Sequence, residues 1–149
     1  MVRMEINASN QLEEAKDRCT LKVTTQMKIR GVRAANELRN ASNLVLRGQR
    51  HGRVYKVPHT KRHYTASAPG EPPAVRTGVL RQSFMPRSKA YQEHGCYVVE
   101  SSIYSNVKYA KWLDEGTKNG RLAARPYRRR VQEKAYSRIK RIYDEPYDR

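Results

Sequence analysis

The sequence predicts an α+β fold in a single domain, 1–149, and three observations carry that prediction. A long stretch with helical periodicity comes first, two alternating stretches that can pair follow, and an amphipathic basic stretch comes last. A Pro-rich basic loop separates the first helix from the rest. We therefore expect a long helix over 1–48, an extended arm over 49–76, an α+β core over 77–143 and a frayed acidic tail over 144–149.

The first segment carries one continuous apolar stripe. Asn10 followed by Glu13 is typical of a capping box, and Gly48 is typical of a helix stop. The alternation at 21–29 favours a strand instead, so a kink near Thr24–Thr25 is the alternative. Because a helix of roughly 50–55 Å is too long for a small domain to cover, we expect part of it to pack on neighbours. The stripe recurs at steps of three or four residues: Leu12, Ala15, Cys19, Val23, Met27, Gly31, Ala34, Leu38, Ala41 and Val45.

The arm, 49–76, is rich in proline and basic residues and has no acidic residue until Glu71. Proline prevents a helix here, and a short hairpin is expected around Val54–Val57. We interpret the arm as a segment ordered mainly by a neighbouring subunit or nucleic acid, and mobile in an isolated monomer; a flexible linker is the alternative. The residues expected at a subunit interface are Tyr64, Pro69, Gly70, Glu71, Pro72 and Pro73.

The core begins with a short helix over Gly78–Ser83, for which Thr77 is the expected cap. Strands are expected over Ser83–Tyr91 and Gly95–Ile103, paired about a turn at Glu93–Gly95. On the second strand, Tyr97, Val99, Ser101 and Ile103 alternate with Val98, Glu100 and Ser102, which predicts a half-buried strand.

Two further helices are expected after the strands. The first runs from about Val107 to Glu115 and ends at Gly116, and Pro126 takes the first position of the last helix. The apolar stripe of that last helix is Tyr127, Val131, Ala135, Ile139 and Ile142. The small core is expected to contain Tyr109, Trp112, Leu113 and Tyr127.

No catalytic constellation is visible, so we expect a protein that is not an enzyme and has no cofactor or metal. The sequence has no nucleophile elbow and no phosphate-binding glycine loop. His59 and His63 have helical ligand spacing, but they lie in a proline-containing loop without further ligands. Asp114 and Glu115 are adjacent and point in different directions on a helix, so one of them is better explained as a partner for an arginine than as half of an acid–base pair. Cys19 and Cys96 fit no metal spacing and are expected to be reduced, partly buried thiols.

The basic surface is the strongest physical signal in the chain. A net charge of +17 accompanies a hydrophobic fraction of only 38%, so the compact chain repels itself and we expect partners to stabilise it. No apolar run is long enough for a membrane span and no secretory signal is visible, so synthesis in a cytosol is expected. The residues expected to contact DNA or acidic partner residues are Arg50, Arg53, Lys56, Lys61, Arg62, Arg128, Arg129 and Arg130.

Three motifs in order resemble a family of tailed-phage proteins, the neck or tail-completion proteins of lambdoid siphophages. They are Thr-Gly-x-Leu-x-x-Ser at 77–83, Tyr-Ala followed by Glu-Gly-Thr at 109–117, and Ala-Arg-Pro-Tyr at 124–127. The resemblance covers roughly 65–135 and departs at Asp114–Glu115, where the family often has an aromatic residue, and at Tyr127, where Phe is common. The motif residues given a structural role are Thr77, Gly78, Leu80, Ser83, Tyr109, Ala110, Glu115, Gly116, Thr117, Arg125, Pro126 and Tyr127.

The resemblance implies a virion protein at the head–tail junction, made in the cytoplasm of a bacterial host. It implies a ring, expected to be a hexamer, that joins the DNA-filled head connector to the tail tube without catalysis. The implied partners are further copies of the chain, a head-closure or connector protein, a tail-terminator or tail-tube protein, and phage DNA as a non-specific contact. The alternative from the residues is a free nucleic-acid-binding protein, such as a chromosome-associated factor.

Overall fold

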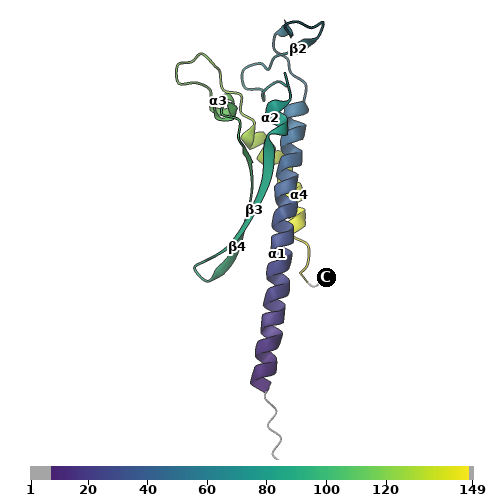
Figure 1. Cartoon of the computed structure of the whole chain (residues 1–149), viewed down its shortest axis with the longest axis vertical. Coiled ribbons are helices and arrows are strands. Elements are labelled where there is room, and N and C mark those ends of the chain that lie inside the picture. The colour runs from purple at the N-terminus through teal and green to yellow at the C-terminus, as the bar shows by residue number, and fades with distance from the viewer. Residues whose placement is uncertain (1–7, 148–149) are drawn as a thin grey trace, which may run out of the picture.

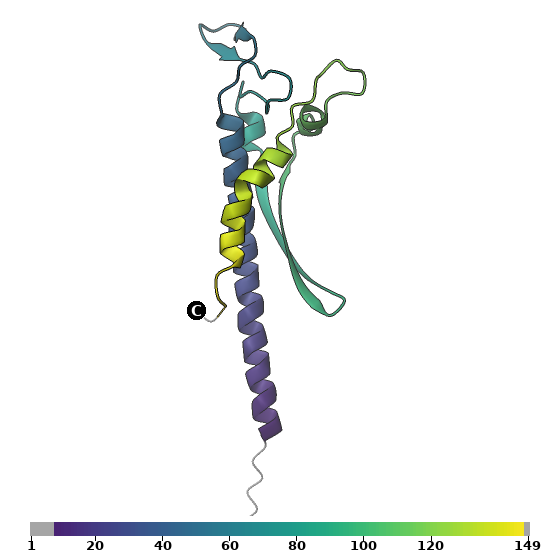
Figure 2. The ribbon, with the colours of Figure 1, turned by 180° about the vertical axis from the view of Figure 1, so that it is seen from behind.

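The computed structural model describes residues 8–147 of the chain, with side chains from residue 11 onward. It confirms the α+β fold class: a long helix carries two antiparallel hairpins, two short helices and a C-terminal helix (Figure 1). The molecule is elongated, because the N-terminal part of the long helix projects beyond the other elements in both views (Figures 1 and 2).

The first helix, α1 (Ala8–Arg47), runs for 40 residues, which corresponds to about 60 Å. It begins two residues before the expected cap, Asn10, and ends directly before Gly48, as expected. The alternative of a kink near Thr24–Thr25 is wrong, since α1 is continuous and straight there (Figure 1). The hydroxyl of Thr24 donates to the carbonyl oxygen of Thr20 at 2.9 Å, a bond that satisfies a threonine inside a helix.

The long hairpin pairs β3 (Phe84–Glu93) with β4 (Cys96–Ser105) along their full lengths. His94 and Gly95 connect them with φ angles of 49° and 78°, the left-handed conformations of a two-residue type I′ turn. The expected pair of strands and its turn are confirmed, and each strand continues two residues further toward its C-terminal end than expected.

One face of this hairpin lies directly on α1 at Gly31. A Cβ atom at Gly31 would lie 2.3 Å from Val99 Cγ1 and 2.6 Å from Ser88 Oγ, closer than any real contact. The hydroxyl of Ser101 also donates to the carbonyl oxygen of Gly31 at 2.8 Å. Glycine is therefore needed at this crossing because the strands approach the helix backbone.

The C-terminal helix, α4 (Arg128–Tyr143), packs along α1 (Figure 2). Its expected apolar stripe is confirmed, with Tyr127, Val131, Ala135 and Ile142 buried. The expectation that Pro126 begins the helix is wrong, because Tyr127 is the N-cap with a non-helical φ of −124°. The backbone N–H of Tyr127 is held by Asp114 Oδ1 at 2.9 Å, which delays the start of the helix.

The core lies where α1, α4 and the base of the long hairpin meet. Its buried members are Ala41, Leu46, Leu80, Phe84, Ala110, Tyr127, Val131 and Ala135. The helix α3 (Ala110–Glu115) contributes Ala110 and partly buried Leu113, which lie one turn apart. The expectation that Tyr109 and Trp112 belong to this core is wrong, since they are 41% and 56% exposed. This helix is too short to bury more than one narrow face.

Three short elements complete the fold. A small hairpin pairs β1 (Val54–Lys56) with β2 (His63–Thr65), so the expected hairpin near Val54–Val57 exists but continues to Thr65. The helix α2 (Val79–Gln82) follows Gly78, whose φ is 83° and which caps it without a side-chain bond. Thr77 is therefore not the cap that the sequence predicts. Similarly, α3 starts three residues after the expected Val107.

The start of the acidic tail is docked rather than frayed. Arg33 forms two hydrogen bonds of 2.6 and 2.7 Å to the carboxylate of Glu145. The buried guanidinium of Arg30 donates to the carbonyl oxygen of Pro146 at 2.6 Å and lies 3.8 Å from the ring centroid of Tyr147. The expectation of a frayed tail is thus wrong for residues 144–147, because two cations of α1 hold them; residues 148–149 lie outside the described part of the chain.

Candidate functional site

The three sequence motifs converge around one groove beside the end of α1. The groove has a volume of about 550 Å³ and receives residues from the arm, the turn at Thr77–Gly78, α3 and the loop that contains Arg125. Its lining is mainly apolar and aromatic and includes Leu46, Tyr64, Val75, Tyr109, Trp112 and Leu122. The structure thus brings together motif residues that are separated by almost fifty positions in the sequence.

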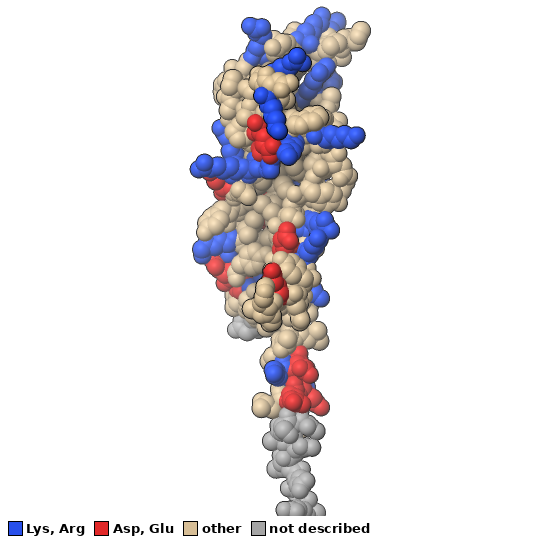
Figure 3. Space-filling model, turned by 90° about the vertical axis from the view of Figure 1, so that its left-hand side faces the viewer, with Lys and Arg blue, Asp and Glu red and all other residues tan. Residues whose placement is uncertain are grey.

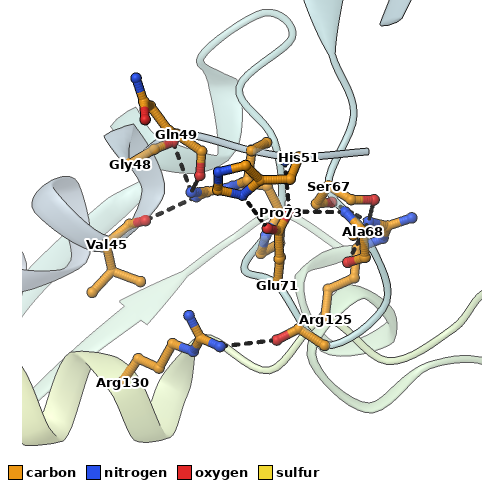
Figure 4. Close-up of polar contacts among 12 residues, drawn as sticks. Val45, Gly48, Gln49, His51, Ser67, Ala68, Glu71, Pro73, Arg125 and Arg130 are labelled. Atoms are coloured by element: carbon orange, nitrogen blue, oxygen red, sulfur yellow. Dashed lines mark hydrogen bonds and ion pairs between the residues drawn. The ribbon is translucent and has the colours of Figure 1, made fainter. Parts of the chain in front are cut away.

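The segment 66–73 of the arm, here called the strap, is held by its own chain. Arg125 donates to the backbone carbonyl and hydroxyl oxygens of Ser67 and, at 3.4 Å, to the carbonyl oxygen of Ala68 (Figure 4). The N–H of Gly70 donates to the carbonyl oxygen of Ala124 at 3.3 Å. Arg130 adds a bond of 3.1 Å to the carbonyl oxygen of Gly70. The strap is therefore ordered within one chain, and the expectation that the whole arm depends mainly on neighbours is wrong here.

Glu71 is the centre of the strap. Its carboxylate accepts bonds from the N–H of Ala68 at 2.9 Å and the N–H of His51 at 3.1 Å, and lies 2.7 Å from His51 Nδ1 (Figure 4). The bond from Ala68, followed by those from His51, lowers the pKa of Glu71 from its ordinary 4.5 to about 2. The first acid after a long basic stretch thus closes a loop of the arm onto itself.

We expect Glu71→Gln to loosen the strap, because an amide accepts these bonds less strongly than a carboxylate. Backbone amide hydrogen exchange at Ala68 and His51 should accelerate several-fold, while exchange in α4 stays unchanged. Glu133→Gln is the matched control, since Glu133 is an exposed acid paired within α4 to Arg129. Unchanged protection at Ala68 in the Glu71→Gln protein would contradict the role assigned to this carboxylate.

The same carboxylate sets a pH window. Because the folded pKa of Glu71 lies below its unfolded value, the stability that it contributes is complete above about pH 4.5. That contribution is lost as the pH falls from about 4.5 to about 2. Exchange at Ala68, corrected for its intrinsic pH dependence, should therefore rise across this window in the wild-type protein and stay flat in Glu71→Gln.

Arg50 is a helix cap rather than a free cation. Its guanidinium donates to the carbonyl oxygens of Val45 at 2.8 Å, Gly48 at 2.7 Å and Pro73 at 3.2 Å (Figure 4). The last carbonyls of a helix have no partner within the helix, and a basic side chain satisfies them. Burial lowers the pKa of Arg50. Arg50 was expected to contact DNA or an acidic partner, but its guanidinium instead joins the end of α1 to the strap.

The arginines at the start of α4 also have partners in their own chain. Arg128 donates to Asp114 Oδ2 at 2.6 Å and to Glu115 at 2.8 Å. Both bonds raise the pKa of Arg128, and the bond to Glu115 has the larger effect. This confirms that one of these acids is the partner of an arginine, and shows that both acids contact the same one. Arg129 pairs with Glu133 at 2.9 Å. An acidic partner is thus present for each of the two, but it comes from the same chain.

Asp114 has a second role that sequence reasoning missed. Its Oδ1 accepts the backbone N–H groups of Tyr127 at 2.9 Å and Arg128 at 3.2 Å. A carboxylate at this place satisfies unpaired donors and interacts favourably with the positive end of the helix dipole. The missed signal is that α4 has no capping side chain of its own.

Several motif residues maintain backbone geometry around the groove. Gly116 has a φ of 78°, and a Cβ there would lie 2.9 Å from the carbonyl oxygen of Leu122. Thr117 Oγ1 accepts the N–H of Leu122 at 3.0 Å. Ser83 Oγ lies 2.6 Å from Ser105 Oγ, which joins the end of α2 to β4. Thr117 and Leu122 line the groove, whereas Gly116 and Ser83 fix the backbone of the segments next to it.

The remaining candidates do not form a site. Among the described residues, no group of three or more His, Cys, Asp or Glu is placed to hold a metal ion. Cys19 and Cys96 are free and exposed, so the expectation of partial burial is wrong. Within residues 8–147, no helix has the length and apolar character needed to cross a membrane.

No protein-family model matches the chain, and no match to it was found among curated proteins or among solved structures.

Proposed function

We propose that this chain is a structural subunit of the head–tail junction of a tailed phage. Copies of it form a ring around the DNA channel and join the head connector to the tail tube. The observation that carries the proposal is the apolar stripe of α1, which continues past the part of the helix that the chain itself covers. The motif resemblance supplies the phage context, and the uncovered stripe supports assembly.

The stripe changes from buried to exposed along a single helix. Ala34 and Ala41 are 0% and 3% exposed beneath α4 and the long hairpin, whereas Leu12 and Val23 on the same stripe are 72% and 39% exposed. A helix with an apolar face is stabilised mainly by the surface on which that face packs. The N-terminal part of α1 therefore needs a partner, which we assign to a second copy of the chain.

The exposed area supports the same conclusion. The chain exposes 11909 Å², whereas a compact protein of 17.3 kDa exposes roughly 7,800 Å². The difference, roughly 4,000 Å², is in the range that obligate subunits bury in their interfaces. An isolated monomer of this shape would leave most of that surface in contact with water.

The two ends of the molecule are unlike, so contact of the exposed stripe with the core of another copy joins two different surfaces. Glu13, Glu14 and Asp17 are exposed near the free end of α1 beside the cations Lys16, Arg18 and Lys22, whereas Lys and Arg predominate around the opposite end (Figure 3). Contacts between two different surfaces of identical subunits close into a ring when the rotation permits. A ring of this kind explains the over-long helix without requiring a second protein at that surface.

We expect Leu12→Glu/Val23→Glu to disrupt assembly, because buried carboxylates in an apolar interface are strongly unfavourable. Sedimentation equilibrium should show the wild-type chain as an oligomer and the variant near the monomer mass of 17.3 kDa. Negative-stain microscopy of phage particles carrying the variant should show separate heads and tails.

The matched control is Gln11→Glu/Leu21→Glu, which adds the same charge at exposed positions away from the stripe. This control should assemble like the wild type. The ring is ruled out if the wild-type chain is a monomer at micromolar concentration. The junction role is ruled out if particles made without the chain have stably joined heads and tails.

The second candidate is a free nucleic-acid-binding protein, and the charge distribution favours it. The net charge is +17, and the stretch 38–70 contains seven basic residues and no acid. Electrostatic binding to phosphates would follow, with an affinity that falls steeply with salt. Tight binding of duplex DNA by a monomer at physiological salt would support this candidate over the ring.

A further inference from the structure

The β1–β2 hairpin projects from the end of α1, away from the core (Figures 1 and 2). All three residues of β1 are exposed, and the hairpin joins the body at its base, where Gly52 N–H donates to the carbonyl oxygen of Ala66 at 3.0 Å. At its tip, Val57 accepts the N–H and hydroxyl of Thr60. The hairpin is a narrow two-stranded ribbon with solvent on most of its surface.

The cations of this ribbon differ from those of α4 in how they are paired. On α4, Arg138 contacts Glu37 at 3.3 Å and Lys140 contacts Asp144 at 2.6 Å, in addition to the pairs of Arg128 and Arg129. Within residues 8–147, by contrast, no ion pair involves the four cations of the ribbon, all of which are exposed: Arg53, Lys56, Lys61 and Arg62. Four of the seven Lys and Arg residues of α4 thus pair with acids of residues 8–147, whereas none of the four ribbon cations does.

The ribbon is also stiffened before any ligand arrives. Tyr55 and Tyr64 form a cross-strand pair with ring centroids 5.8 Å apart and an interplanar angle of 26°. The guanidinium of Arg76 lies 5.9 Å from the ring centroid of Tyr64, so β2 also contacts the segment that leads into α2. Cations on a preformed ribbon lose less conformational entropy on binding than cations on a mobile loop.

We propose that the β1–β2 hairpin is the nucleic-acid contact of this chain and that it binds the phosphate backbone of duplex DNA. A two-stranded ribbon has a width that the major groove accepts, and free cations on it neutralise phosphates on both sides. The exposed tip residues Pro58, His59 and Thr60 form no apolar wedge, which favours a polar ligand over a membrane surface. Contact with DNA rests on the proposed function, but the assignment to the hairpin rather than α4 does not.

The test compares two quadruple variants that remove the same charge. Arg53→Gln/Lys56→Gln/Lys61→Gln/Arg62→Gln removes the unpaired cations of the hairpin. Lys111→Gln/Arg129→Gln/Arg138→Gln/Lys140→Gln removes four cations that are paired inside the chain. Binding of a fluorescent 30-base-pair DNA duplex is measured by anisotropy over a range of salt concentrations.

The slope of log K against log salt is negative, and each phosphate contact adds about 0.9 to its magnitude. Removing the four hairpin cations should therefore make the slope shallower by up to about 3.6. The paired-cation variant should make it shallower by less than about 1. Equal losses in both variants, or full binding by the hairpin variant, would overturn the assignment. Displacement of the duplex by polyglutamate at an equal concentration of charge would also overturn it and identify an acidic protein surface as the ligand.

Sedimentation of the hairpin variant separates this inference from the ring. The hairpin lies at the opposite end of α1 from the exposed stripe, so the variant should assemble like the wild type (Figure 1). An assembled variant with the shallower salt slope supports the inference. If the hairpin variant assembles and binds DNA normally, the inference is overturned and the ring is not. If the wild-type chain is a monomer and the hairpin variant has lost DNA binding, only the ring is overturned.

Discussion

Replacing Tyr127 by alanine is expected to lower the free energy of unfolding by about 3–5 kcal/mol, as for other large aromatic side chains in a core. Tyr127 is 4% exposed and its ring packs edge-to-face on Phe84, with centroids 5.9 Å apart. The backbone N–H of residue 127 keeps its bond to Asp114 in the variant, so the loss reports on the core rather than on the start of α4. Urea unfolding followed by far-UV circular dichroism measures the change.

Tyr127→Phe is the matched control. It keeps the ring and removes only the hydroxyl, which donates to the carbonyl oxygen of Ala110 at 3.2 Å. We expect a loss of about 1 kcal/mol, the usual net contribution of one hydrogen bond. If Tyr127→Ala costs less than about 1 kcal/mol, the ring is not central to the core.

Gly31→Leu is expected to lower the free energy of unfolding by about 3 kcal/mol. Helix propensity alone predicts the opposite sign, because leucine favours a helix by nearly 1 kcal/mol over glycine. The loss comes from the crossing, where a Cβ meets Val99 Cγ1 at 2.3 Å and Ser88 Oγ at 2.6 Å. The hairpin must move away from α1, which also breaks the bond from Ser101 to Gly31.

The control for helix propensity is Asn36→Leu, an exposed position on the same helix, where the change should stay within about 0.5 kcal/mol. Adding Val99→Ala to Gly31→Leu should recover part of the loss, because it removes the methyl group nearest the new side chain. A Gly31→Leu protein as stable as the wild type would show that the hairpin does not lie on α1 at this residue.

The stripes of α1 and α4 could be predicted because a helix places every third or fourth residue on one face. Ala34, Ala41, Val131 and Ala135 are buried as that periodicity requires. The turn at His94–Gly95 was predictable for a similar reason, since glycine adopts its positive φ at little cost. These features depend on local sequence alone.

Contacts between distant segments were not predictable in the same way. Tyr109 and Trp112 are aromatic, yet α3 exposes them beside the groove rather than in the core. Nothing near Arg30 in the sequence indicates that it holds the tail more than one hundred residues later. Such contacts arise from the way α1 serves as a common support for segments far apart in the chain.

The sequence by itself determined the α+β class, the positions of the helices and of the long hairpin, and the excess of positive charge. Only the tertiary structure decided which cations are paired within residues 8–147: Arg128 and Arg129 meet acids brought near by folding, whereas no described acid pairs with the cations of the β1–β2 hairpin. The physical reason is that periodicity and turn preference act between neighbours in sequence, while charge compensation depends on distances in space that only the packed chain sets.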